Sequence, residues 1–283
     1  MLFSTGYANA GTWTLPLDYP GAHSTMIYGV SGSNFVGTYT DASGANHGFL
    51  YNDNAWTTFD APPDFTFMQV RGIDGSNIVG GYGERLGGAH GFIYDGSNWV
   101  TFDLPGATST SITGIDESNI IGLADKQNFV YNLSTHDKTI IEKPGAASTY
   151  VHGIDGSNIV GYYTETVPND PFSFIIHGFI YDGANWITLD MPGATQTRIW
   201  DIDGSNIVGW GFLYNMTTDT WTALDVPGAR TTYAQAIDGD NIVGYYIDDT
   251  FHTHGFLYTI PEPATLLLLG LGAVILRRKP LKN

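Results

Sequence analysis

The chain has 283 residues, with 36 glycines, 14% aromatic residues and only 14% charged residues, a composition that favours short strands joined by tight turns over helices. Its net charge of −17 argues against a nucleic-acid partner, because proteins that bind a phosphate backbone concentrate lysine and arginine. The absence of cysteine excludes disulfides, thiolate metal sites and a cysteine nucleophile.

The first ten residues contain neither the basic segment nor the long apolar segment of a secretory signal peptide. Ala8-Asn9-Ala10 is similar to the small-residue end of a signal-peptide cleavage site, which suggests that the protein begins upstream of Met1. We therefore interpret residues 1–10 as the remnant of a signal peptide or as a disordered segment.

Residues 11–260 contain one sequence unit six times, with a period of about 41 residues. The first phrase of the unit, GIDGSN or a variant, begins at Gly29, Gly72, Gly114, Gly153, Asp201 and Ala236. The second phrase, HGFIY or a variant, ends at Tyr51, Tyr94, Tyr131, Tyr181, Tyr214 and Tyr258. The third phrase, WVTFDLPGA or a variant, begins at Trp13, Trp56, Trp99, Lys138, Trp186 and Trp221.

Each unit predicts four short strands joined as two hairpins, because the Asp-Gly and Asn residues between the strands supply the positive φ angles of tight turns. Two such hairpins form a four-stranded antiparallel sheet, which is a propeller blade. The sequence therefore predicts an all-β, six-bladed β-propeller over residues 11–260. The predicted blades are residues 20–60, 61–103, 104–142, 143–190, 191–225, and 226–260 together with 11–18.

The order of the phrases predicts how the ring closes. The chain begins with the fourth-strand phrase at Trp13 and leaves the repeat after the third-strand phrase at Tyr258. The N-terminal strand is therefore expected to complete the last blade, which removes the exposed sheet edges of an open array.

The chain direction assigns the two faces of the predicted propeller. If the innermost strand of each blade runs from top to bottom, the Asp-Gly-Ser-Asn turns lie at the bottom, and the links between second and third strands lie on top. The longest of these links is expected in the fourth unit, around residues 165–176, and it includes Glu165 and Asp170. Because variable loops on a rigid scaffold often bind ligands, the top is the candidate face, although the sequence identifies no ligand-binding residue.

The composition changes abruptly after Ile260. Pro261, Glu262 and Pro263 are followed by an uncharged apolar run over residues 264–276 and then by the basic residues Arg277, Arg278 and Lys279. The run is short for a spanning helix, which needs about 20 residues, but its basic end fits the cytoplasmic side of a membrane. We expect residues 261–283 to form a sorting tail with a transmembrane helix that leaves the propeller outside.

This tail resembles the PEP-CTERM sorting signal of Gram-negative bacteria, since all three of its parts are present in order. The resemblance implies that an exosortase-like enzyme recognises Pro261, Glu262 and Pro263, that residues 264–276 anchor the chain temporarily in the inner membrane, and that the basic residues stop the transfer. It also implies a final location at the cell surface or outside the cell, and a link to exopolysaccharide and biofilm. The 41-residue unit with its HGF phrase resembles HAF-type extracellular repeats, which imply location but no activity.

Histidines occupy the same position of the second phrase in four units, at His47, His90, His177 and His254. A position that is repeated in this way favours a repeated structural bond over several catalytic sites. His252 and His254 are two residues apart, but no third metal ligand is evident beside them.

An acidic residue stands two places before the proline of every third phrase, at Asp18, Asp60, Asp103, Glu142, Asp190 and Asp225. We interpret these residues as caps of a type II turn, with calcium binding at the blade rims as the alternative. Another acid heads most of the bottom turns, at Asp74, Asp116, Asp155, Asp203 and Asp238, and is also expected to be structural. No cofactor or metal site is assigned.

Tryptophan recurs at the start of the third phrase and is expected to pack between neighbouring blades. Trp200 and Trp210 stand outside this pattern and are candidates for a platform that stacks against sugars.

These features predict an exported cell-surface or matrix protein with a binding or scaffolding role in the exopolysaccharide layer. We expect no enzymatic activity and assign no catalytic residue, because no known nucleophile, phosphate or zinc motif is present. The alternatives are a hydrolase or lyase that acts on polysaccharide from the top face, and a lectin with one weak site per blade. A lectin or scaffold should have equivalent residues in every blade, whereas an enzyme should break the repeat with one cluster of acids and bases.

Overall fold

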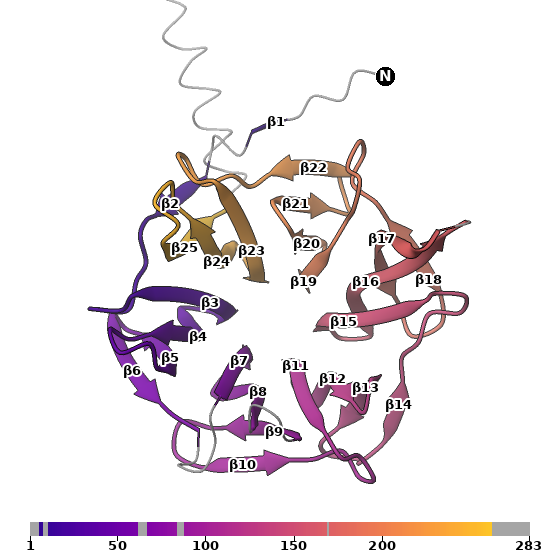
Figure 1. Ribbon diagram of the computed structural model, residues 1–283, viewed down its shortest axis with the longest axis horizontal. Helices are drawn as coiled ribbons and strands as arrows, with labels where there is room; N and C mark the ends of the chain where they lie inside the picture. The colour runs from indigo at the N-terminus through magenta and orange to yellow at the C-terminus, as the bar shows by residue number, and fades with distance from the viewer. Residues whose placement is uncertain (1–5, 8–10, 62–66, 84–87, 169, 262–283) are drawn as a thin grey trace, which may run out of the picture.

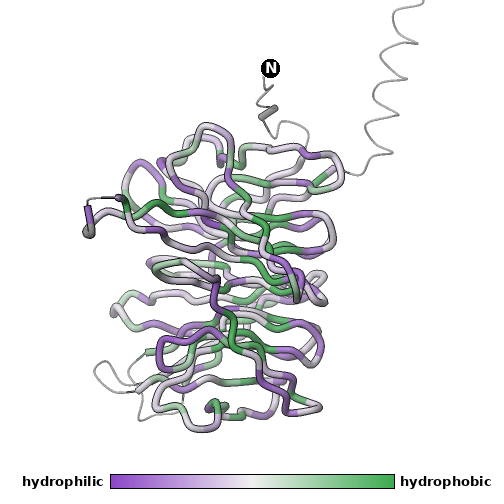
Figure 2. The backbone as a smooth tube through the Cα atoms, turned by 90° about the vertical axis from the view of Figure 1, so that its right-hand side faces the viewer, coloured by the Kyte–Doolittle hydropathy of each residue, from purple (hydrophilic) through white to green (hydrophobic). Residues whose placement is uncertain are grey.

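A computed structural model describes residues 6–7, 11–61, 67–83, 88–168 and 170–261. Six antiparallel sheets stand around a central axis in chain order, and each contains the four strands of one blade (Figure 1). The prediction of an all-β, six-bladed propeller is therefore confirmed over the described residues. Seen from the side, the hydrophobic stretches lie mainly within the disc, and many hydrophilic ones lie at its turns (Figure 2).

The strands of the first three blades follow the predicted phrases. Blade 1 contains β3 (Ser24–Ser31), β4 (Asn34–Thr40), β5 (Asn46–Asn52) and β6 (Ala55–Phe59). Blade 2 contains β7 (Phe67–Asp74), β8 (Asn77–Gly83), β9 (Ala89–Tyr94) and β10 (Trp99–Phe102). Blade 3 contains β11 (Thr110–Asp116), β12 (Asn119–Ala124), β13 (Gln127–Asn132) and β14 (Lys138–Ile140).

The other three blades differ more in strand length. Blade 4 contains β15 (Ser148–Asp155), β16 (Asn158–Val167), β17 (Asp170–Tyr181) and β18 (Trp186–Leu189). Blade 5 contains β19 (Ile199–Asp203), β20 (Asn206–Gly209), β21 (Phe212–Asn215) and β22 (Thr220–Ala223). Blade 6 contains β23 (Thr231–Asp238), β24 (Asn241–Ile247) and β25 (Thr253–Thr259), and β2 (Thr12–Thr14) completes it.

The N-terminal strand closes the ring as predicted. β2 pairs antiparallel with β25, so that Trp13 lies opposite Tyr258. One feature was not predicted: β1 (Gly6–Tyr7) adds a fifth strand to blade 5 by pairing in parallel with β22. This strand lies within residues 1–10, for which the sequence predicts a signal-peptide remnant or a disordered segment.

The long link of blade 4 was expected to be a loop, and that expectation was wrong. The flanking strands extend into it, and Glu165 pairs with Ile175 across an elongated hairpin. The paired stretches 164–167 and 174–176 are rich in β-branched and aromatic residues, which favour an extended strand, so the pairing continues past the edge of the blade. Glu165 and Asp170 both lie on this hairpin, where Asp170 accepts a hydrogen bond from Ser173 Oγ at 2.6 Å.

The core consists of separate clusters between adjacent blades. The phenylalanine of every second phrase is fully buried: Phe49, Phe92, Phe129, Phe179, Phe212 and Phe256. The tryptophan of the third phrase packs on this ring in its own blade, as in the pairs Trp99–Phe92 at 4.4 Å and Trp186–Phe179 at 4.9 Å between ring centroids. These tryptophans border the clusters that join one blade to the next, which agrees with the predicted role.

Candidate functional site: the central channel

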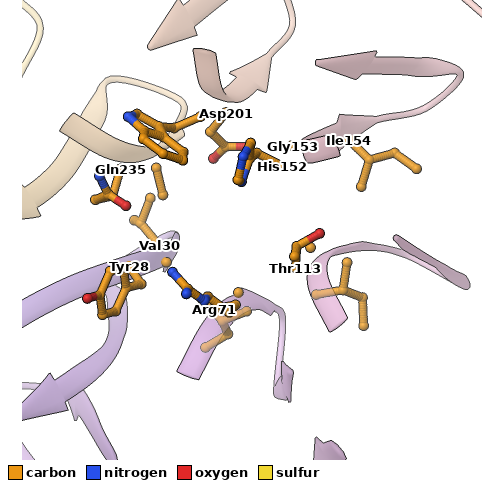
Figure 3. A pocket seen from close by; sticks show the side chains of 16 residues that line it. Tyr28, Val30, Arg71, Thr113, His152, Gly153, Ile154, Asp201 and Gln235 are labelled. Carbon is orange, nitrogen blue, oxygen red and sulfur yellow. The ribbon is translucent and has the colours of Figure 1, made fainter. Parts of the chain in front are cut away.

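A β-bulge interrupts the innermost strand of every blade at the same place. The register shifts by one residue at Tyr28, Arg71, Thr113, His152, Trp200 and Gln235. A bulge re-aims one side chain out of the regular alternation of a strand. All six of these residues line a cavity at the centre of the ring (Figure 3).

The six bulge residues differ in chemistry although the backbone around them repeats. A phenol, a guanidinium, a hydroxyl, an imidazole, an indole and an amide occupy equivalent positions in blades 1 to 6. The next position in the chain is glycine in four blades and alanine in the sixth, but blade 5 has Asp201 there. The centre of the propeller is therefore its most asymmetric part.

Aromatic side chains form an arc from blade 4 to blade 1, and two of them, Trp200 and Tyr28, line the central cavity. The arc consists of Tyr150, Tyr162, Trp200, Trp210, Tyr233, Tyr245 and Tyr28. Within it, Tyr150 stacks on Tyr162 at 4.8 Å, and Tyr233 stacks on Tyr245 at 4.8 Å. Trp210 stacks on Tyr233 at 5.6 Å, and Tyr245 meets Tyr28 edge-on at 6.0 Å. The corresponding channel positions of blades 2 and 3 are occupied by Gln69, Gly81, Ser111 and Leu123, so that side of the channel has no aromatic wall.

Two arginines complete this arc. Arg198 lies over the rings of both Tyr162 and Trp210, at 5.5 and 5.3 Å from the centroids, and so joins blade 4 to blade 5. Arg71 lies over Tyr28 at 5.2 Å and donates a hydrogen bond to Gln69 Oε1 at 2.8 Å. Neither arginine forms an ion pair with a carboxylate of the described residues.

Three buried polar atoms near the cavity have no hydrogen-bond partner among the residues that the structure describes. They are His152 Nε2, Arg198 Nε and Trp200 Nε1. The His152 ring packs edge-on against Trp200 at 4.5 Å, so these groups lie close together. Buried polar groups normally find partners, and three unsatisfied ones at one place indicate a site that water or a ligand completes.

Asp201 places a carboxyl group in this asymmetric part of the channel. Its Oδ2 accepts a hydrogen bond from the backbone N–H of Ile237 at 2.9 Å. Burial raises the pKa of Asp201 to about 7, and the nearby carboxylates of Asp203 and Asp238 act in the same direction. The side chain is thus protonated in a large fraction of molecules at neutral pH.

His152 is affected in the opposite direction. Burial, together with the positive charges of Arg71 and Arg198, lowers the pKa of His152 to about 3. Its imidazole is therefore neutral at physiological pH and offers one donor and one acceptor.

A ring of hydrogen bonds closes the bottom of the channel. The acid of each bottom turn accepts a bond from a backbone N–H in the turn of the next blade, as from Gly156 to Asp116 and from Gly204 to Asp155, both at 2.8 Å. Asp238 of blade 6 accepts a hydrogen bond from the backbone N–H of Gly32 in blade 1, which completes the ring. In blade 1 a serine replaces the acid, and Ser31 Oγ accepts from the backbone N–H of Gly75 at 3.0 Å. These acids are structural, as predicted, and their carboxylates line the lower channel.

The repeated histidines and the acids before the prolines are partners of each other. Nδ1 of the histidine lies within hydrogen-bond distance of the aspartate in the pairs His47–Asp60, His90–Asp103, His177–Asp190 and His254–Asp18, at 2.6 to 3.0 Å. In blade 3, Asn128 replaces the histidine and donates to Glu142 Oε1 at 3.2 Å. The prediction of a repeated structural bond for the histidines is confirmed.

A threonine, and not the acid, binds the connection after the outer strands β2, β10, β14, β18 and β22. Leu104 N donates to Thr110 Oγ1 at 3.0 Å, and the bond recurs from Tyr19 to Thr25 and from Val226 to Thr232. The predicted acidic turn caps instead bind the third strand, as when Asp18 accepts from Gly255 N at 3.0 Å. The glycines of these connections have positive φ angles as predicted, for example 87° at Gly106.

The remaining predicted sites are not brought together. His252 Nδ1 lies 2.7 Å from Thr250 Oγ1, while His254 faces Asp18, so the two histidines have separate partners. Among the described residues, no group of three histidines or acids is arranged to hold a metal ion. In the same part of the chain, no helix has the length and apolar character needed to cross a membrane. Of the predicted tail, Pro261 is described, whereas Glu262, Pro263, residues 264–276, Arg277, Arg278 and Lys279 lie outside the described residues.

Sequence reasoning missed the channel residues, except for Trp200 and Trp210. The signal was present in the first phrase. The residue directly before the first phrase differs in every repeat, and the structure shows that this is the bulge position.

Comparison with known proteins agrees with the tail and the fold. Residues 259–279 match the PEP-CTERM protein-sorting motif, and no curated protein matches the chain. The β-propeller domain of the Trilobed protease from Pyrococcus furiosus is similar in structure, with a TM-score of 0.51 at 10% identity, covering 84% of this chain and 98% of that one. The Aleuria aurantia lectin in complex with Fucα1-6GlcNAc has a TM-score of 0.50 at 13% identity, covering 87% and 96%. At these identities the likeness shows the fold alone.

Proposed function

We propose that this chain is an exported propeller that binds a glycan of the exopolysaccharide layer at the top of its central channel. The sorting motif at residues 259–279 implies export, anchoring through the C-terminal tail and processing by an exosortase. After processing, the propeller would reach the cell surface or the extracellular matrix. The likeness of the repeat to HAF-type extracellular repeats supports the same location.

The aromatic arc is the observation that supports glycan binding. Sugars present apolar C–H faces that pack on aromatic rings, and their hydroxyls pair with polar groups between those rings. Tyr150 is 38% exposed at one end of the arc, and Trp210 and Tyr233 lie partly exposed along it. Unsatisfied donors at Trp200 and Arg198 supply the polar groups.

The symmetry of the molecule favours one site over six. The residues that repeat in all blades are engaged in structural bonds, and those that face the channel do not repeat. A lectin with one weak site per blade needs equivalent binding residues in every blade. Because the repeated residues are used in structural bonds, we favour a single site in the channel.

A hydrolase or lyase is the second candidate, because Asp201 and His152 break the repeat in the way expected of an acid–base cluster. Both line the same cavity, and an ideal Cβ on Gly153, the residue after His152, would lie 2.6 Å from Asp201 Oδ1. We favour binding without catalysis because the carboxyl group of Asp201 is engaged by the backbone of Ile237.

The test uses exopolysaccharide extracted from the producing cells. Binding is measured by calorimetry with the full chain in mild detergent, for wild type, Trp210→Ala and Tyr150→Ala. Phe251→Ala removes an aromatic ring that is 72% exposed on the link between β24 and β25, outside the lining of the central cavity, and is the matched control. We expect both arc variants to weaken binding about tenfold or more, given about 1–3 kcal/mol per stacked ring, and the control to bind normally. Equal binding by all variants would refute the channel site, and new reducing or unsaturated ends formed by wild type but not by Asp201→Asn would favour the enzyme.

A further inference from the structure

We infer that the saccharide bound in the channel is acidic, and that Arg71 binds its carboxylate or sulfate group. This inference rests on the proposed function, because it assumes that the channel holds a glycan. It names the chemical class of that glycan, which the aromatic arc alone does not specify.

The distribution of positive charge is the first observation. Only six lysines and arginines lie among the described residues of a chain whose net charge is −17: Arg71, Lys126, Lys138, Lys143, Arg198 and Arg230. Arg71 lines the central cavity, and Arg198 lies over the rings of Tyr162 and Trp210; neither arginine has a carboxylate partner among the described residues. A partly buried guanidinium without a counterion has an unfavourable free energy, and an anionic ligand would relieve it.

Arg71 is held in a suitable position. It projects from the bulge of β7 into the cavity, its guanidinium lies over the Tyr28 ring, and one of its N–H groups binds Gln69 Oε1 (Figure 3). Its other N–H groups make no hydrogen bond to the described residues, and their planar fork matches the two oxygens of a carboxylate. Because Tyr28 and Gln69 fix the plane of the guanidinium, Arg71 loses little side-chain entropy when the anion binds.

The unsatisfied donors support the same class of ligand. Trp200 Nε1–H and Arg198 Nε–H can only donate, so the groups that complete them must be acceptors. His152 is neutral, so its Nε2 does not add a positive charge that would draw the anion away from Arg71. A sugar acid provides both the acceptors and the negative charge. Its ring oxygens and hydroxyls accept hydrogen bonds from the unsatisfied donors, and its acidic group binds Arg71.

The charges along the channel also give the direction of entry. Arg71 lines the upper cavity of the channel, whereas Asp74, Asp116, Asp155, Asp203 and Asp238 surround its lower end. An anionic chain is attracted to the first region and repelled by the second. The saccharide therefore enters from the top and stops above the aspartates, and does not thread through the ring.

Paired probes test the inference. Oligogalacturonate and its methyl ester share one ring chemistry and differ in charge, and dextran sulfate with dextran provides the same comparison for sulfate. Binding to the full chain is measured by calorimetry for wild type, Arg71→Gln, Arg71→Lys and Lys138→Gln. Lys138 is exposed on the outermost strand of blade 3, so its variant makes the same charge change outside the channel.

We expect wild type to bind at least one acidic probe about tenfold or more tightly than its neutral counterpart. Arg71→Gln should abolish that preference, Arg71→Lys should retain part of it because the charge remains without the fork, and Lys138→Gln should keep all of it. Unfolding curves of the variants confirm that they fold.

Each other outcome has a defined meaning. Equal binding of acidic and neutral probes, or a preference that survives in Arg71→Gln, would overturn the inference and leave the proposed function standing. If neither the probes nor the native exopolysaccharide bind, the proposed function fails as well.

Discussion

His254 Nδ1 lies 2.6 Å from Asp18 Oδ2, and the two residues are 236 positions apart in the chain. The same bond joins His47 to Asp60, His90 to Asp103 and His177 to Asp190 within single blades. The closing blade therefore uses the same structural bond as the others, with one partner supplied by each end of the chain. Closure of the ring is a property of the repeat and needs no special motif.

Asp18→Ala should destabilise the propeller more than Asp103→Ala. Both variants remove a histidine–aspartate bond, but Asp18 also accepts from Gly255 N and holds the N-terminal strand on blade 6. We expect a loss of about 1–3 kcal/mol for Asp18→Ala, with faster amide exchange in β2 and β25. Denaturant unfolding and hydrogen exchange measure the two effects, and equal losses in the two variants would argue against a special role at the closure.

The Asp201 carboxyl should make stability fall with pH. Its folded pKa is raised to about 7 by burial, while in the unfolded chain it ionises near pH 4. The folded state therefore retains a proton that the unfolded state has lost, and the free energy of unfolding decreases as the pH rises from about 4 to about 7. Asp201→Asn should be more stable than wild type at pH 7 and should lack this part of the pH dependence. A wild-type and variant pair with parallel stability curves from pH 4 to 7 would contradict the raised pKa.

His47 should add a second pH-dependent contribution. Desolvation lowers its pKa, but the hydrogen bonds to Asp60 and Asp41 outweigh this effect and leave the pKa raised. Its stabilising contribution is therefore complete below pH 6.5 and is lost as the pH rises through the folded pKa. In His47→Asn this loss should be absent, and NMR titration of the imidazole in the wild type gives the pKa directly. A value at or below 6.5 would show that the two carboxylates do not act as described.

Gly153→Ala should be far more damaging than Gly72→Ala, although the two glycines occupy the same position of the repeat. A Cβ on Gly153 would lie 2.7 Å from the backbone Cα of Asp201, which cannot move without shifting β19. The nearest atom to a Cβ on Gly72 would be a methyl group of Val79 at 3.3 Å, and the nearest backbone atom would be Gly114 Cα at 3.5 Å, an ordinary van der Waals distance. We expect a cost of about 1–3 kcal/mol for Gly153→Ala and less than half of that for Gly72→Ala in denaturant unfolding. Similar costs would mean that blades 4 and 5 are not packed this closely.

The sequence predicted the features that repeat, because repetition places the same side chain in the same surroundings six times. The count of blades, the tight turns and the closure by Trp13 all follow from the order of three phrases. The partnership of His47 with Asp60 was missed because the two positions were considered separately, although both recur in phase.

The channel was harder to predict because its residues occupy equivalent positions of the repeat but differ in type from blade to blade. A bulge that places Arg71 and His152 in one cavity depends on backbone register, which a hydrophobic pattern does not specify. The long hairpin of blade 4 was also misjudged, since Glu165 pairs with Ile175 where a loop was expected. In both places the local backbone, and not the residue types, decides the structure.

The number of saccharide chains bound per propeller tests the central claim most directly. Calorimetry or native mass spectrometry with a short oligosaccharide from the exopolysaccharide layer gives this number for the wild type. One asymmetric channel, formed by bulge residues that differ in every blade, predicts one oligosaccharide per chain and its loss in Trp210→Ala. Several equivalent molecules per chain, bound as well by Trp210→Ala as by wild type, would contradict the account.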